Sequence, residues 1–152
     1  MRRSFFLPLL VLSGLAMLLA GCGSGTKLGG VAVTAISIRT ATPATPQPQA
    51  ILNLRFTNEN VVPVGLSGGR HRLFINGKAA GQALSREPLG LPQLSTATQE
   101  VTVTLEPGFL ASIAGTSQAS YRLESVLFVT AGEERMDIKT QSQGAIDVSA
   151  LR

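Results

Sequence analysis

Hydrophobic and polar residues alternate along most of the chain after residue 30. The alternation is clearest from Ile51 to Asn58, where every second residue is apolar, and it returns from Gln99 to Leu105. A period of two places one face of a strand against a core and leaves the other face to water. Less regular segments predict further strands, so that about seven to eight strands are expected. These segments are 31–39, 70–75, 78–84, 121–129, 135–139 and 144–148.

Turn-forming residues separate the predicted strands. Asn76-Gly77 is a strong signal for a two-residue hairpin of type I′. Three prolines in segment 40–49 predict an exposed loop, and segment 85–98 also has the composition of a loop. No strand is followed by a long helical segment, which argues against parallel βαβ units.

Local irregularities complete the predicted architecture. A change of phase near Thr34-Ala35 predicts a β-bulge, and Ser67-Gly68-Gly69 is expected to end a short apolar run, 61–66. Segment 108–114 has the apolar spacing of one short helix. Together the pattern predicts an all-β fold, an immunoglobulin- or fibronectin type III-like β-sandwich of about seven to eight strands with one short helix.

The first residues have the pattern of an export signal. A basic start, Met1-Arg2-Arg3, precedes an apolar stretch from Phe5 to Ala20 that is too short for a stable membrane span. Leu19-Ala20-Gly21-Cys22 resembles the lipobox of bacterial lipoproteins. The resemblance implies cleavage between Gly21 and Cys22 and acylation of the Cys22 thiol. The alternative is an ordinary signal peptide followed by a free, buried cysteine.

Three segments therefore organise the chain: a signal peptide at 1–21, a Gly-rich tether at 22–30 and one β-sandwich domain at 31–152. Two or three acyl chains on Cys22 would anchor the domain to a membrane. Gly23 stands where lipoproteins retained at the inner membrane of Gram-negative bacteria carry Asp. The resemblance thus implies the periplasmic face of the outer membrane, if the organism is Gram-negative.

Composition and charge exclude several functions. The formal net charge of +4 falls to +2 without Arg2 and Arg3, and no basic run resembles a nucleic-acid footprint. With one cysteine and one histidine, the chain has no internal disulfide and no Cys-based zinc site. No cofactor or metal is expected.

Segment 51–105 resembles the late embryogenesis abundant (LEA) type 2 proteins and their water stress and hypersensitive response (WHy) domain. The shared pattern is an alternating strand that ends in Asn58-Glu59-Asn60, a hairpin at Asn76-Gly77 and the strand Val101–Leu105. Glu59 replaces the central proline of the family's Asn-Pro-Asn, but side-chain bonds from Asn58 and Asn60 can preserve the turn. The resemblance implies a folded, non-enzymatic protein without a cofactor, linked to desiccation and other stress.

One sequence also matches a catalytic pattern. Residues Gly65–Gly69 fit the Gly-x-Ser-x-Gly nucleophile elbow, with Ser67 as the nucleophile, but a β-rich segment follows and no histidine lies beyond His71. A Gly-rich turn is the favoured interpretation. Arg70, His71 and Arg72 are interpreted as a solvated strand end, with a small basic patch for lipid headgroups as the alternative.

Two functions remain open. The first is a lipid-anchored envelope protein that protects against stress or maintains the envelope by binding or shielding surfaces, with a protein or lipid partner. The second is a periplasmic binding or assembly module that recognises a peptide or a small apolar ligand.

Overall fold

Eight antiparallel strands and one short helix form the structure, a computed structural model that describes residues 29–42, 47–131 and 134–151. The predicted signal peptide, Cys22 and most of the predicted tether lie outside the described residues. The elements are β1 (Val31–Thr40), β2 (Gln49–Asn58), β3 (Val64–Ile75), β4 (Lys78–Ser85), β5 (Leu89–Leu91), β6 (Ser95–Leu105), α2 (Phe109–Ser112), β7 (Gln118–Ala131) and β8 (Glu134–Asp147).

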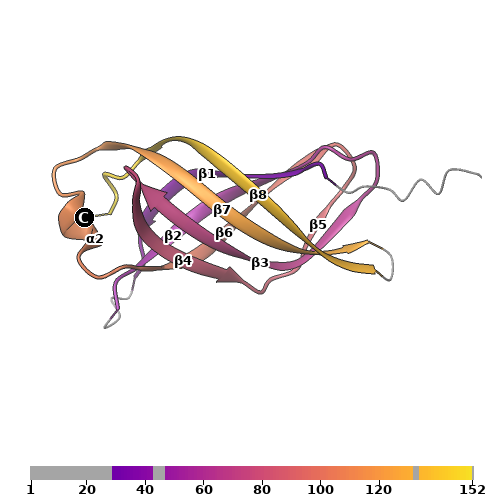
Figure 1. Cartoon of the computed structure of the whole chain (residues 1–152), viewed down its shortest axis with the longest axis horizontal. Helices are drawn as coiled ribbons and strands as arrows, with labels where there is room; N and C mark the ends of the chain where they lie inside the picture. The colour runs from indigo at the N-terminus through magenta and orange to yellow at the C-terminus, as the bar shows by residue number, and fades with distance from the viewer. Residues whose placement is uncertain (1–28, 43–46, 132–133, 152) are drawn as a thin grey trace, which may run out of the picture.

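Hydrogen bonds join the strands into one curled sheet in the order β1-β2-β6-β4-β3-β7-β8, with β5 paired to β3 (Figure 1). The first and last strands approach each other. Just beyond β8, the Ala150 carbonyl accepts bonds from the backbone N–H and from Oγ1 of Thr40, at 3.0 and 3.1 Å. The sheet is therefore nearly closed around a single core. The predicted all-β class is confirmed. Every described strand belongs to one sheet, and the packing of two separate sheets as a sandwich stays a prediction.

The core is built from the inward-facing residues of the alternating strands. In β2 the predicted apolar residues Leu52, Leu54 and Phe56 are all buried. The same parity in β6 buries Val101, Val103 and Leu105. This close match arises because each strand has one face against the core and one against water.

The predicted hairpin and bulge are both present. Asn76 and Gly77 have φ angles of 48° and 78°, the left-handed pair that a type I′ turn requires. In β1 the pairing with β2 shifts register between Ala35 and Ser37, next to the predicted bulge.

The segment Ser67-Gly68-Gly69 does not end a strand, which corrects the prediction from sequence. Strand β3 runs through them, and its pairing with β7 shifts register between Leu66 and Gly68. A Cβ at Gly68 would lie 2.4 Å from the Ser85 carbonyl oxygen, and the φ of Gly68 is 151°. The glycine is therefore needed for close approach of β4 to a bulge inside β3.

Three predicted boundaries also differ. Strand β8 is continuous from Glu134 to Asp147, instead of two strands at 135–139 and 144–148, because it pairs along its whole length with β7. Strand β5 and the start of β6 lie inside the segment predicted as a loop, 85–98. The helix covers only Phe109–Ser112, because its C-cap Ile113 already has non-helical dihedral angles.

Different parts of the chain lie at the two ends of the molecule's long axis. Figure 1 shows α2 and the C-terminus together at one end, and the start of β1 at the other. In the part of the chain that the structure describes, no helix has the length and apolar character needed to cross a bilayer.

Candidate functional site

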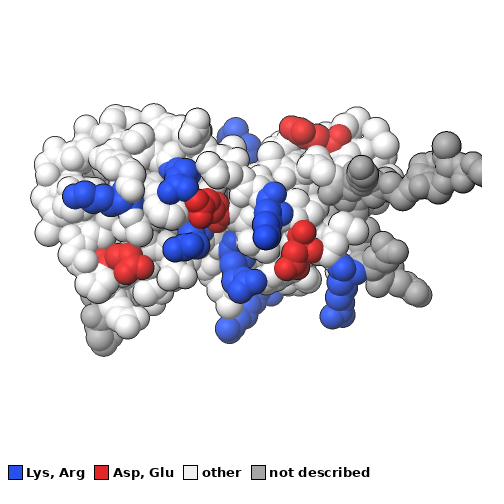
Figure 2. Space-filling view, in the orientation of Figure 1, with Lys and Arg blue, Asp and Glu red and all other residues white. Residues whose placement is uncertain are grey.

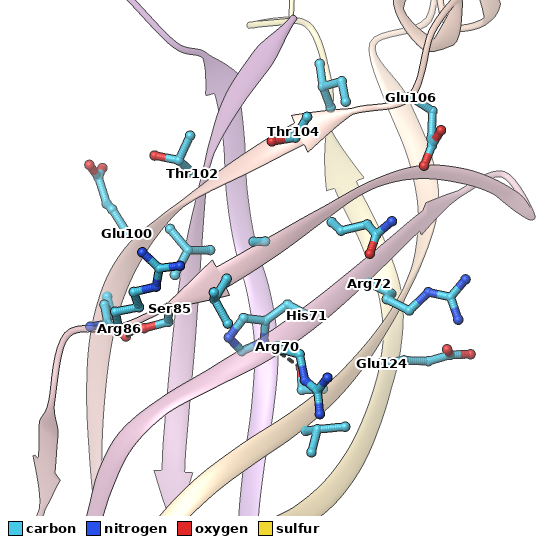
Figure 3. A pocket seen from close by; sticks show the side chains of 18 of the residues that line it. Arg70, His71, Arg72, Ser85, Arg86, Glu100, Thr102, Thr104, Glu106 and Glu124 are labelled. Atoms are coloured by element: carbon cyan, nitrogen blue, oxygen red, sulfur yellow. Dashed lines mark hydrogen bonds between the residues drawn. The ribbon is translucent and has the colours of Figure 1, made fainter. Parts of the chain in front are cut away.

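A hollow of about 1660 Å³ lies where β4 and β6 separate. These strands pair only over Gly81–Ala83 and Val103–Leu105. Figure 3 shows Thr102 and Glu100 continuing along β6 while β4 diverges toward Ser85 and Arg86. Among the described residues, no strand pairs with this side of β6 over 95–102.

Glycine positions explain why the strands meet and then part. A Cβ at Gly81 would lie 2.3 Å from the Thr104 carbonyl oxygen, so glycine alone permits the short β4–β6 contact. At the other end of β4, Ser85 lies against the bulge at Gly68 on β3. Strand β4 is thus held to β3 and leaves β6. Side chains bridge the gap, since Ser85 Oγ donates to Gln99 Oε1 at 3.1 Å and Gln99 Nε2 donates to the Glu87 carbonyl at 3.2 Å.

His71 lines the hollow from the inner face of β3. Its side chain is 2% exposed, and its ring contacts the Phe56 ring edge-on with centroids 6.3 Å apart. Nδ1 lies 2.8 Å from Ser125 Oγ, whereas Nε2 has no hydrogen-bond partner among the described residues. Burial lowers the pKa of His71 from 6.5 to about 4, so the imidazole is neutral at pH 7.

This placement corrects the interpretation of residues 70–72 as a solvated strand end. Arg70 and Arg72 are exposed, but His71 between them points into the core, because successive residues of a strand alternate faces. His71 shares the parity of Leu73 and Ile75, which are also buried. That parity was the signal in the sequence that could have revealed its burial.

The outer face that lines part of the hollow carries mixed charge. The guanidinium groups of Arg70 and Arg72 lie 5.6 and 5.8 Å from the ring centroids of Phe128 and Phe74. Arg122 also covers Phe74 and pairs with Glu124. In Figure 2, basic and acidic side chains interleave along the middle of this face. The arginines therefore do not make a basic patch with His71.

Ser67 and His71 are not arranged as a nucleophile and its base. Ser67 lies within β3, exposed, and its Oγ donates to the Phe128 carbonyl at 3.2 Å. His71 faces the interior and contacts Ser125 instead. The strand-to-helix turn of a nucleophile elbow does not occur at Ser67, because the strand continues to Ile75.

Asn58 organises the end of the molecule where β1 begins. It is 1% exposed, and its Nδ2 donates to the carbonyls of Val62, Leu91 and Pro92 at 2.9, 3.2 and 2.9 Å. Its Oδ1 accepts from the backbone N–H of Asn60 at 3.0 Å, which is the side-chain turn bond that the sequence predicted. One buried amide therefore joins the loop after β2 to the loop after β5, and the turn forms with Glu59 in place of proline.

The other motif residues have a structural setting as well. Asn76 Oδ1 accepts bonds from the backbone N–H and Oγ of Ser120 on β7, at 3.0 and 3.2 Å. Gly77 supplies the second left-handed residue of the hairpin. Gly21 and Cys22 lie outside the described residues. In the ranges that the structure describes, no three side chains of His, Cys, Asp or Glu gather as metal ligands.

No family model matches the chain, and no curated protein matches it. Several solved structures, in contrast, are similar to this chain. The protein AT1g01470 of Arabidopsis thaliana is similar at 11% identity and a TM-score of 0.54, over 85% of this chain and 89% of that one. A protein provisionally described as late embryogenesis abundant, At2g46140.1, has 13% identity and a TM-score of 0.49, over 93% and 85%. An Archaeoglobus fulgidus protein has 18% identity and a TM-score of 0.44, over 78% and 100%. The likeness to AT1g01470 shows that the two chains share a fold.

Proposed function

We propose that this chain is a non-enzymatic, lipid-anchored envelope protein whose LEA type 2-like domain protects surfaces at the membrane during water loss or other stress. The observation that carries the proposal is the position of the WHy-like residues in the fold. Asn58 ends β2, Asn76-Gly77 joins β3 to β4, and Val101–Leu105 lies in β6. The strands that these residues end, join or form all belong to one sheet, in a fold shared with AT1g01470.

The membrane part of the proposal rests on the lipobox-like residues Leu19–Cys22. Acylated Cys22 would anchor the domain, and Gly23 favours the periplasmic face of the outer membrane in a Gram-negative cell. The non-enzymatic part is supported by the separation of Ser67 from His71, since Ser67 is exposed whereas His71 is buried. A protein or lipid partner in the envelope is the expected contact, with no cofactor and no nucleic acid.

A deletion strain tests the proposal. We expect the strain to lose viability after drying, and the wild-type gene to restore it. The gene carrying Cys22→Ala should fail to restore it, although its folded domain is unchanged, because the domain is no longer held at the membrane. Equal survival of the deletion and wild-type strains under drying, osmotic and cold stress would remove the protective role. Mass spectrometry of the native protein tests acylation of Cys22 separately.

The open side of β6 favours a second candidate, recognition of an extended peptide by strand addition. Over 95–102, the edge of β6 beside the hollow is without a strand partner among the residues described, and such an edge can hydrogen-bond an added strand. A photo-crosslinking residue at Thr102, which lines the hollow, should then capture one saturable partner in intact cells. The same residue at Ser120, exposed on β7, should not. Equal labelling from both positions would count against this candidate.

A further inference from the structure

A tip with two exposed apolar side chains stands at the end of the domain where β1 begins. Loop 59–63, between β2 and β3, and loop 92–94, between β5 and β6, form this amino-terminal tip. Val61 in the first loop is 74% exposed, and Leu94 in the second is 69% exposed. These are the two most exposed large hydrophobic side chains in the described residues.

The two loops are held together, so the tip is a preformed surface. The backbone N–H of Leu94 donates to the Asn60 carbonyl at 3.1 Å, which places the residue before Val61 next to Leu94. Asn58 binds both loops through the carbonyls of Val62 and Pro92. The exposed side chains therefore project from a backbone that is already ordered.

Leu94 has an unusual backbone conformation for its residue type. Its φ is 49°, in the left-handed region where glycine and asparagine are common and leucine is not. Neither burial nor backbone preference explains a leucine at this position. A role for the exposed side chain outside the fold would explain it.

The start of the domain lies directly beside the tip. The backbone N–H of Glu59 donates to the Gly30 carbonyl at 2.6 Å. Eight residue steps separate Cys22 from Gly30, and a chain of that length reaches about 28 Å when fully extended. An acyl group on Cys22 would thus keep Gly30, which contacts the tip at Glu59, within this distance of the bilayer surface, so that the tip meets the surface at a high effective concentration.

We propose that the amino-terminal tip inserts Val61 and Leu94 into the interfacial region of the lipid bilayer, as a second membrane contact beside the anchor. This inference rests on the proposed anchoring through Cys22. The tip lies at one end of the long axis, with α2 and the C-terminus at the other (Figure 1). Insertion would therefore hold the domain upright, with its far end directed away from the membrane.

Site-directed spin labelling of the full-length lipidated protein tests the inference. Acylation blocks Cys22, the only native cysteine, so a nitroxide attaches only to an introduced thiol. The protein is placed in vesicles of phosphatidylethanolamine with a minority of phosphatidylglycerol. Labels at Val61→Cys and, separately, at Leu94→Cys should lie about 5–10 Å below the headgroup boundary. A label at Leu84→Cys, a leucine 48% exposed on β4, should remain in water.

A second variant and a salt series distinguish apolar insertion from attraction between charges. Leu94→Asp, in the chain labelled at residue 61, should return that label to water, and aspartate tolerates the left-handed conformation, so the loop is retained. Raising salt from about 0.1 M to about 1 M should leave the depth of both tip labels unchanged, because the contact is apolar. Labels shielded only when other envelope proteins are present would indicate a protein partner and would overturn the inference.

Failure of the anchor is distinguishable from failure of the tip. A protein that does not float with vesicles and has a free Cys22 thiol refutes both the anchoring and the insertion. A protein that floats with the vesicles, while the labels at 61 and 94 are as water-accessible as the label at 84, refutes insertion alone.

Discussion

The burial of His71 predicts that the stability of the domain falls as the pH is lowered below neutrality. In the unfolded chain the imidazole takes up a proton near pH 6.5, whereas burial lowers its pKa in the folded domain to about 4. Between these values the unfolded state binds more protons, so the free energy of unfolding decreases as the pH falls. Above about pH 6.5 both states are neutral and this contribution is constant.

The size of the effect follows from the two pKa values. Their difference of about 2.5, at 1.36 kcal/mol for each pKa unit, gives a loss of about 3 kcal/mol between pH 7 and pH 4. Ser125 Oγ, which faces Nδ1, is neutral and does not offset this loss. For a domain of this size, about 3 kcal/mol is a large part of the total stability.

Urea denaturation followed by circular dichroism measures this loss in the chain lacking residues 1–22. The control is His71→Gln, which carries no titrating group at this position. Carboxylates titrate in both proteins, so the test is the difference between their two pH profiles. We expect that difference to change by about 3 kcal/mol from pH 7 to pH 4. Parallel profiles would show that the imidazole has similar pKa values in both states, and would refute the reasoning.

Three further predictions concern the turns and close approaches. Asn58→Ala should lower the free energy of unfolding by about 3 kcal/mol in urea denaturation, because it removes the amide's hydrogen bonds to the carbonyls of Val62, Leu91 and Pro92 and to the Asn60 N–H; a loss below about 1 kcal/mol would contradict the role of Asn58. Gly81→Ala should be more destabilising by thermal denaturation than Gly77→Ala, because a Cβ at 81 meets a carbonyl at 2.3 Å whereas one at 77 meets nothing within 4 Å; the reverse order would refute this steric reasoning. Leu94→Asn should leave stability unchanged or raise it by up to about 1 kcal/mol, since asparagine tolerates a positive φ, and a clear loss in melting temperature would show that Leu94 supports the fold.

The parts of the fold that sequence predicted best are those where local pattern and tertiary environment agree. Strand β2 alternates strictly because one face of it meets the core throughout. Asn76-Gly77 forms the predicted hairpin because both residues tolerate a positive φ. In each case a short segment contains all the information needed for its own conformation.

The errors come from residues whose conformation depends on distant partners. The sequence around Gly68 is typical of the end of a strand. Gly68 instead lies in a bulge, where the Ser85 carbonyl of another strand approaches closely. Residues 140–143 of β8 are all polar and were not predicted as a strand, but β7 pairs with every one of them. Pairing with a neighbouring strand determines these conformations, and the local sequence pattern does not reveal that pairing.

The sequence predicted the candidate site less well than it predicted the fold. The parity of His71 with Leu73 indicated burial, but the divergence of β4 from β6 depends on contacts at Gly68 and Gly81 that only the folded chain brings together. The left-handed backbone of Leu94 likewise gives no signal in the local sequence, because leucine rarely adopts it. Acylation of Cys22 stays a prediction, because that residue lies outside the described part of the chain.

The position of β6 in the sheet has a consequence for the order of folding. Strand β6 lies between β2 and β4, which precede it in the chain, so it completes contacts that neither can make alone. A chain that emerges amino-terminus first can form the β1–β2 hairpin early, but that hairpin cannot join the β3–β4 hairpin until Leu105 has emerged. Such long-range closure slows folding. Until then both hairpins expose unpaired edges, so this is the interval in which a chaperone would be needed most.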